Sequence, residues 1–128
     1  PMAAKLQTLA FNSERQLLMA DFYSALGAGM APKSVKVGSV VYQGALGDLE
    51  VMIYLAKKSS PPPIPQISMR FLVENVAERL KAVSAVAGVQ VLMDVMDLPD
   101  GKKAIVLDPD GHSIELIQLW AEAGEEQG

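Results

Sequence analysis

The sequence lacks cysteine and contains a single histidine, His112. Without cysteine this chain forms no disulfide, thiolate nucleophile, zinc ribbon or iron–sulfur site. One histidine excludes any site built from two histidines of the same chain. The chain is therefore poor in the side chains that zinc and iron prefer as ligands.

Long hydrophobic runs and basic stripes are also missing. No apolar run approaches the roughly 20 residues of a membrane-spanning helix, and Lys5 and Gln7 make the N-terminus too polar for a signal peptide. Residues 1–60 hold six basic and four acidic side chains (+2), and residues 61–128 hold five and eleven (−6). Neither half shows a basic stripe with interleaved aromatics, which would indicate nucleic-acid binding. We therefore expect a cytoplasmic protein without nucleic-acid or membrane partners.

Hydrophobic residues, by contrast, make up 50% of the 128 residues, and charged residues 20%. This composition excludes a disordered chain, and the length allows about two-thirds of the unfolded surface to be buried. The first half predicts a strand, a helix that begins with a capping box at Ser13–Gln16 and ends at Gly27 or Gly29, and further strands. The predicted strands are Lys5–Phe11, Val35–Leu46 and Leu49–Leu55, and the apolar stripe of the helix is Leu18, Phe22, Ala25 and Leu26.

The second half repeats this pattern after a stiff, proline-rich linker at 57–65. A second capping box lies at Asn75–Glu78, and Gly88 follows the helix. The helical stripe is Val76, Leu80, Val83 and Ala87, and the predicted strands are Ile67–Val73, Val89–Val95, Lys103–Leu107 and Ser113–Leu119. We therefore predict an α+β fold, with residues 2–128 forming one domain of two βαβββ modules at about 5–56 and 66–120. Helices would cover the outer faces of curved, mixed sheets that enclose a cavity.

Three segments resemble the vicinal oxygen chelate superfamily, which includes glyoxalase I, extradiol dioxygenases and bleomycin-binding proteins. The most specific is Asp108–Leu116 (DPDGHSIEL), which is similar to the last turn and strand of that family. The others are Asp21-Phe22-Tyr23 with Leu26-Gly27, and Phe71–Val76. The resemblance covers nearly the whole chain and implies the same two-module fold.

Enzymes of this superfamily typically hold a divalent metal through His, Glu, His and Glu. The resemblance places the first and third of these positions on Thr8 and Ser68, and the fourth on Glu115. The second falls on Glu50 or Met52, depending on how the strands are matched. Because hydroxyls are weak ligands, we expect a degenerate metal site and no cofactor, with a bound divalent metal as the alternative.

Strand alternation places Arg70 on the same face as Ser68, within possible reach of Glu115. An Arg70–Glu115 ion pair would stabilise the carboxylate without a metal. The alternatives are that Glu115 acts as a general base and that Arg70 binds a carboxylate or phosphate of a ligand. His112 is expected to cap its turn and face solvent.

The missing histidines and the resemblance to the bleomycin-binding branch favour metal-free binding of a small organic ligand. The resemblance also implies a homodimer. The acidic second half would suit a cationic ligand. The candidate ligand-binding residues are Thr8, Glu50, Met52, Tyr54, Ser68, Arg70, Glu115 and Trp120. The main alternative is a glyoxalase-like lyase or isomerase, or a dioxygenase, with Glu115 as base. A partner-binding domain without a ligand is a third reading.

Overall fold

The computed structural model describes residues 3, 6–36, 39–56 and 67–120. The chain divides into two compact units, Pro1–Pro63 and Ile64–Gly128, and each is considered by itself. The linker predicted at 57–65 lies outside the described residues. Within the described part of the chain, neither helix is long and apolar enough to cross a membrane.

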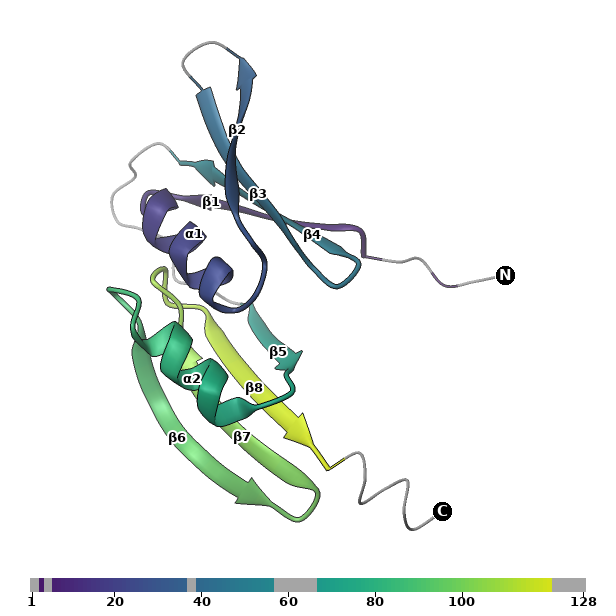
Figure 1. The fold of residues 1–128 in the computed structure, drawn as a ribbon. Helices are drawn as coiled ribbons and strands as arrows, with labels where there is room; N and C mark the ends of the chain where they lie inside the picture. Colours follow the sequence, from purple (N-terminus) through teal and green to yellow (C-terminus); the bar gives the residue numbers. More distant parts are fainter. Residues whose placement is uncertain (1–2, 4–5, 37–38, 57–66, 121–128) are drawn as a thin grey trace. The chain divides into compact units, whose positions relative to one another are not determined.

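Unit 1 is a four-stranded mixed sheet with one helix (Figure 1). Its elements are β1 (Thr8–Ser13), α1 (Gln16–Ala25), β2 (Ala31–Lys36), β3 (Ser39–Leu46) and β4 (Leu49–Leu55). The strand order is β1-β4-β3-β2, with β1 parallel to β4 and the other neighbours antiparallel. The helix packs on β1, β3 and β4, so it covers one face of the sheet.

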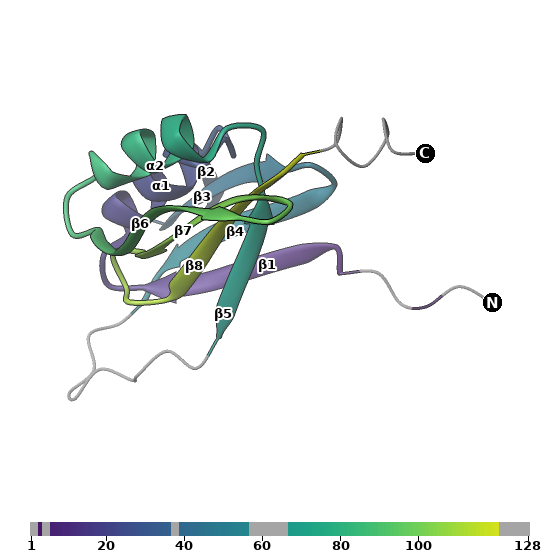
Figure 2. The ribbon, with the colours of Figure 1, turned by 90° about the horizontal axis from the view of Figure 1, so that it is seen from below.

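Unit 2 repeats this arrangement with the strand order β5-β8-β7-β6. Its elements are β5 (Ser68–Leu72), α2 (Val76–Ser84), β6 (Gln90–Leu98), β7 (Gly101–Leu107) and β8 (Ser113–Leu119). Strand β5 is parallel to β8, and α2 packs on β6, β7 and β8 (Figure 2). The predicted α+β fold of two βαβββ modules is therefore confirmed. Gly27 and Gly88, predicted to end the helices, both have positive φ angles that favour glycine.

The core of unit 1 differs from the predicted helical stripe. The buried side chains of α1 are Met19, Ala20, Phe22 and Tyr23, whereas Leu18 and Ala25 are only partly buried. The Tyr23 ring lies 5.1 Å from that of Phe11 on β1 and 4.9 Å from that of Phe22. Positions 19, 22, 23 and 26 also follow helical spacing, so the true stripe starts one residue later than predicted.

The capping box predicted at Ser13–Gln16 is wrong. Helix α1 begins at Gln16 after Arg15, with no side-chain cap, because β1 continues through Ser13. The Ser13 hydroxyl accepts a hydrogen bond from the Arg15 backbone N–H at 2.9 Å. The Gln16 amide instead donates to the carbonyls of Val40 and Ile53, both at 2.9 Å, and so ties the helix start to β3 and β4.

The second helix follows its prediction more closely. Asn75 is the N-cap of α2, and its side-chain oxygen accepts from the Glu78 N–H at 3.1 Å. Val76, Leu80 and Val83 are buried, and the buried residues of the adjoining strands are Ala104, Val106, Ile114 and Leu116. Ala87 lies beyond the end of the helix and is exposed.

One predicted strand, Val35–Leu46, proves to be two. Strand β2 begins at Ala31, four residues before the predicted start, although Pro32, Lys33 and Ser34 have little preference for strands. The strand lies at the edge of its sheet, where a proline without an N–H is tolerated. This segment is a strand because it pairs with β3, although its own sequence does not favour one.

Candidate functional site

In each unit, one face of the sheet packs against the helix, and we call the opposite face the helix-free face. On β4, Val51 and Ile53 are buried in the core, so the alternating residues Glu50, Met52 and Tyr54 point to the helix-free face. On β8, Ile114 and Leu116 are buried, which places Ser113, Glu115 and Ile117 on the helix-free face. The candidate polar residues therefore belong to two surfaces, one in each unit.

On the helix-free face of unit 1, the Glu50 carboxylate accepts two hydrogen bonds from neutral groups. The Thr8 hydroxyl donates to Oε1 at 2.8 Å, and the Gln43 amide donates to Oε2. These bonds lower the pKa of Glu50 below its usual value, with Thr8 contributing most, against a smaller opposing effect of burial. The charge of Lys33 on β2 adds the smallest contribution. Glu50 is therefore held as an anion in one orientation.

Met52 and Tyr54 continue this face along β4. The Tyr54 hydroxyl donates to the Met52 sulfur at 3.7 Å, and both side chains are partly buried. Thr8 pairs with Glu50 and Ala10 with Met52 across β1 and β4. In unit 2, Ser68 pairs with Ser113 and Arg70 with Glu115. If Thr8 corresponds to Ser68, the strand register makes Met52 the counterpart of Glu115. Glu50 then lies two residues before the position that corresponds to Glu115.

On the helix-free face of unit 2, Glu115 lies between two cations. Arg70 Nε donates to its Oε1, and Lys103 Nζ lies 3.4 Å from its Oε2. Burial raises the pKa of Glu115, but hydrogen bonds and charge from Arg70, and then Lys103, outweigh it and lower the pKa overall. The Arg70 side chain is 72% exposed, against 18% for Glu115. The predicted proximity of Arg70 and Glu115 is thus present in the structure.

The structure separates Trp120 from the other candidates of unit 2. Trp120 follows the end of β8, where its N–H donates to the Asp100 carbonyl at 2.8 Å. Its ring lies 5.9 Å from Lys102 Nζ, a distance typical of a cation–π contact. Ser68 pairs with Ser113 at the opposite end of β8. Trp120 and Ser68 therefore do not form one site within this unit.

Two functional groups were missed by the sequence reasoning, Gln43 and Lys103. Each reaches its carboxylate from the strand antiparallel to it, β3 for Gln43 and β7 for Lys103. Alternation along a strand predicts which residues share a face, but not which residue of a neighbouring strand lies opposite. Only the register of the pairing brings these side chains to Glu50 and Glu115.

The donor set of either unit fits a divalent metal poorly. Within each unit, the described residues include no group of three His, Cys, Asp or Glu side chains that could hold a metal ion. In unit 1, Glu50 is accompanied by a hydroxyl and an amide that donate to it. In unit 2, Arg70 and Lys103 occupy both oxygens of Glu115, and their charge would repel a cation.

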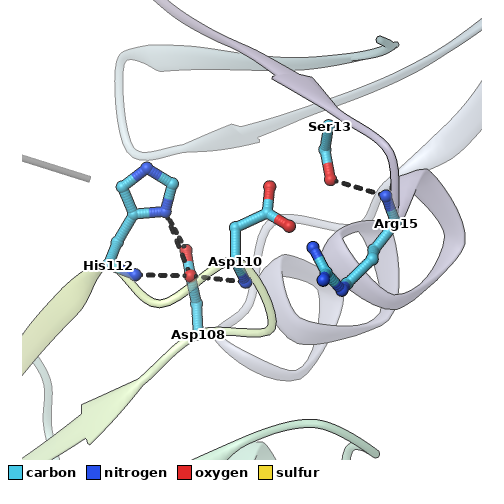
Figure 3. A network of polar contacts seen from close by, with 5 residues as sticks. All are labelled: Ser13, Arg15, Asp108, Asp110 and His112. Atoms are coloured by element: carbon cyan, nitrogen blue, oxygen red, sulfur yellow. Dashed lines mark hydrogen bonds and ion pairs between the residues drawn. The ribbon is translucent and has the colours of Figure 1, made fainter. Parts of the chain in front are cut away.

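Asp108, in the turn before β8, accepts several hydrogen bonds within unit 2 (Figure 3). Its side chain is fully buried, and its Oδ1 accepts from the N–H groups of Asp110 at 3.0 Å and His112 at 2.9 Å. His112 Nδ1 lies 2.8 Å from Oδ2. The His112 side chain is only 15% exposed, so the prediction that it faces solvent is wrong. A buried carboxylate needs such partners, and the imidazole supplies one.

His112 is expected to titrate above its usual value. The hydrogen bond to Asp108 raises the pKa of His112 above 6.5, against an opposing effect of burial, and the charges of Asp108 and Asp110 add to the increase. Because folding raises this pKa, the stabilisation is complete below the unfolded-state pKa and is lost as the pH rises through the folded-state pKa. Because His112 is the only histidine of the chain, its ring signals can be assigned without ambiguity in a proton NMR titration. A midpoint at or below 6.5 would contradict the ion pair.

Comparison with solved structures places this fold among known proteins. A glyoxalase-related enzyme from Fulvimarina pelagi is similar with a TM-score of 0.67 and 19% identity, over 91% of this chain and 88% of that one. TnmS3, an antibiotic binding protein from Streptomyces sp. CB03234, is similar with a TM-score of 0.65 and 22% identity, over 91% and 97%. A glyoxalase/bleomycin resistance protein/dioxygenase family enzyme from Burkholderia phytofirmans PsJN has a TM-score of 0.67 and 14% identity, over 91% and 99%. At these identities the likeness establishes the fold.

The sequence comparisons give the family. No curated protein matches the chain. The model of the Glyoxalase/Bleomycin resistance protein/Dioxygenase superfamily matches residues 6–116, which include most of both modules and the whole DPDGHSIEL segment. The resemblance seen in that segment is therefore confirmed. This chain belongs to the Glyoxalase/Bleomycin resistance protein/Dioxygenase superfamily.

Proposed function

We propose that this chain is a metal-free binding protein for a small organic ligand. Each helix-free face offers a ligand a few oriented polar groups among apolar side chains, as is usual for ligand sites. The contributing residues are Thr8, Gln43, Glu50, Met52 and Tyr54 in unit 1 and Ser68, Arg70, Lys103 and Glu115 in unit 2. The homodimer expected from the sequence resemblance stays a prediction.

The observation that carries this proposal is the environment of Glu115. Both oxygens of this carboxylate contact cationic side chains, and the positive charge of these side chains opposes the approach of a metal ion. Two cations also stabilise the deprotonated form, which weakens the carboxylate as a base. The fold neighbour TnmS3 is an antibiotic binding protein, so a binding role is compatible with this fold.

Divalent ions are expected to leave the melting temperature unchanged. A ligand that binds only the folded state raises stability by RT ln(1 + [L]/Kd), so a metal at one hundred times its Kd adds about 2.7 kcal/mol. The test is a thermal-shift titration with Zn²⁺, Mn²⁺, Ni²⁺ and Mg²⁺, together with metal analysis of protein purified without chelator. Near-stoichiometric metal that is lost on the substitution Glu115→Gln would overturn the metal-free proposal.

A further inference from the structure

The two carboxylates on the helix-free faces are stabilised by groups of different charge. Glu115 contacts the cations Arg70 and Lys103, so those three groups together carry a net positive charge. Glu50 receives its hydrogen bonds from Thr8 and Gln43, which are neutral, and its negative charge is not cancelled by contact. This is the reverse of the formal charges, which are +2 for residues 1–60 and −6 for residues 61–128. Local contacts, and not the charge of each half, set the character of each face.

We propose that the helix-free face of unit 1 recognises a cationic group, such as an ammonium or amidinium, through Glu50. The apolar body of the ligand would lie along Met52 and Tyr54. This inference rests on the proposed binding function and names its ligand class. It places the cation-binding group in unit 1, whose half of the chain has a positive formal charge. The sequence had instead suggested that the acidic second half would suit a cationic ligand.

The geometry of the Glu50 carboxylate suits a second set of donors. A carboxylate offers about four acceptor positions, two on each oxygen. Thr8 uses one position on Oε1 and Gln43 uses one on Oε2, so each oxygen retains capacity for a further bond. A planar cation with two parallel N–H groups can use both oxygens together. Thr8 and Gln43 are then positioning residues, because they hold the carboxylate in one orientation before the ligand arrives.

The side chains next to Glu50 on β4 suit the apolar body of such a ligand. Alternate residues of a strand lie about 7 Å apart on one face, so Met52 adjoins Glu50 and Tyr54 follows it. The Met52 thioether is an adaptable apolar contact group, and the Tyr54 ring offers a large apolar surface. Lys33 on the edge strand β2 is the cation whose charge influences Glu50, but in the described part of unit 1 it forms no ion pair with that carboxylate.

Three probes of one shape and different charge test this inference. Benzamidine is cationic, benzamide is neutral and benzoate is anionic, so they separate charge from ring stacking. Each is titrated into the ¹⁵N-labelled full chain, and amide shifts are followed by NMR. We expect benzamidine to bind most tightly of the three at β1, β3 and β4, and Glu50→Gln to weaken it by about tenfold or more, as for a lost charge-assisted hydrogen bond. Asp21→Asn is the matched control, since it removes one negative charge from the exposed surface of α1 in the same unit.

The outcomes separate this inference from the proposed function. If benzamidine binds equally well to Glu50→Gln, or if Asp21→Asn weakens it as much, Glu50 is not the recognition group. If benzamide or benzoate binds to unit 1 as tightly as benzamidine, the face does not select cations, although a binding function stands. If none of the three probes, nor any compound of a broader aromatic panel, shifts an amide, the inference and the proposed function both fail. A well-dispersed spectrum of Glu50→Gln shows that the variant is folded.

Discussion

Replacing Asp108 with alanine is expected to lower the free energy of unfolding by about 3 kcal/mol, because buried donors lose their acceptor. The Asp108 side chain is fully buried and bonds the N–H groups of Asp110 and His112 as well as the His112 ring. The same turn is closed by backbone bonds from Gly111 N–H to Asp108 and from Asp108 N–H to His112. Urea denaturation at pH 6 measures the change.

Asp108→Asn is the matched variant for this prediction. Its amide oxygen can still accept from both backbone N–H groups, so we expect a loss of only about 1 kcal/mol, the usual value of one net hydrogen bond. The imidazole should then titrate closer to its ordinary pKa, because the anionic partner is gone. An alanine variant as stable as the parent protein would show that the turn does not depend on this carboxylate.

Gly101→Ala is expected to be as damaging, for a steric reason. A Cβ built at Gly101 would lie 1.8 Å from the backbone oxygen of Gln118 and 3.0 Å from the Cα of Leu119. Both contacts are with backbone atoms of β8, which cannot rotate away as a side chain can. We expect a loss of about 3 kcal/mol, at the upper end of overpacking costs, and a melting temperature lower by about 10 °C.

Gly29→Ala separates this clash from ordinary glycine strain. Gly29 has a φ of +62°, and a Cβ there meets nothing within 4 Å. Alanine at this position should cost only about 1 kcal/mol, the price of a left-handed conformation. Differential scanning calorimetry of the two variants gives the comparison. If Gly29→Ala destabilises the chain as much as Gly101→Ala, the close approach between β7 and β8 is not what requires glycine.

Local sequence patterns predicted the fold and most of its strands. Ser113–Leu119 has the predicted bounds because its apolar residues alternate cleanly and a strong turn precedes it. Asn75 was found because a cap depends on residues three apart. The failures, at Ser13 and at β2, occur where contacts with another strand decide the outcome. Such contacts leave little trace in a short stretch of sequence.

The candidate site shows the same division. Glu50, Met52 and Tyr54 share a face, as alternation requires, and Arg70 meets Glu115. Gln43 and Lys103, which donate to the two carboxylates, could not be found without the register. Whether Glu50 or Met52 corresponds to Glu115 also depended on the strand register, which the sequence alone does not give. The chemistry of the faces therefore follows from pairings that only the folded structure specifies.

The strand order has a consequence for synthesis of the chain on the ribosome. In unit 1, β4 is made last but lies between β1 and β3, and in unit 2, β8 lies between β5 and β7. A nascent chain that ends before Leu49 therefore contains β1 without its sheet neighbour β4, and Phe11 has no completed sheet to join. Each unit completes its sheet only when its final strand emerges, after which that unit can fold as the next is translated.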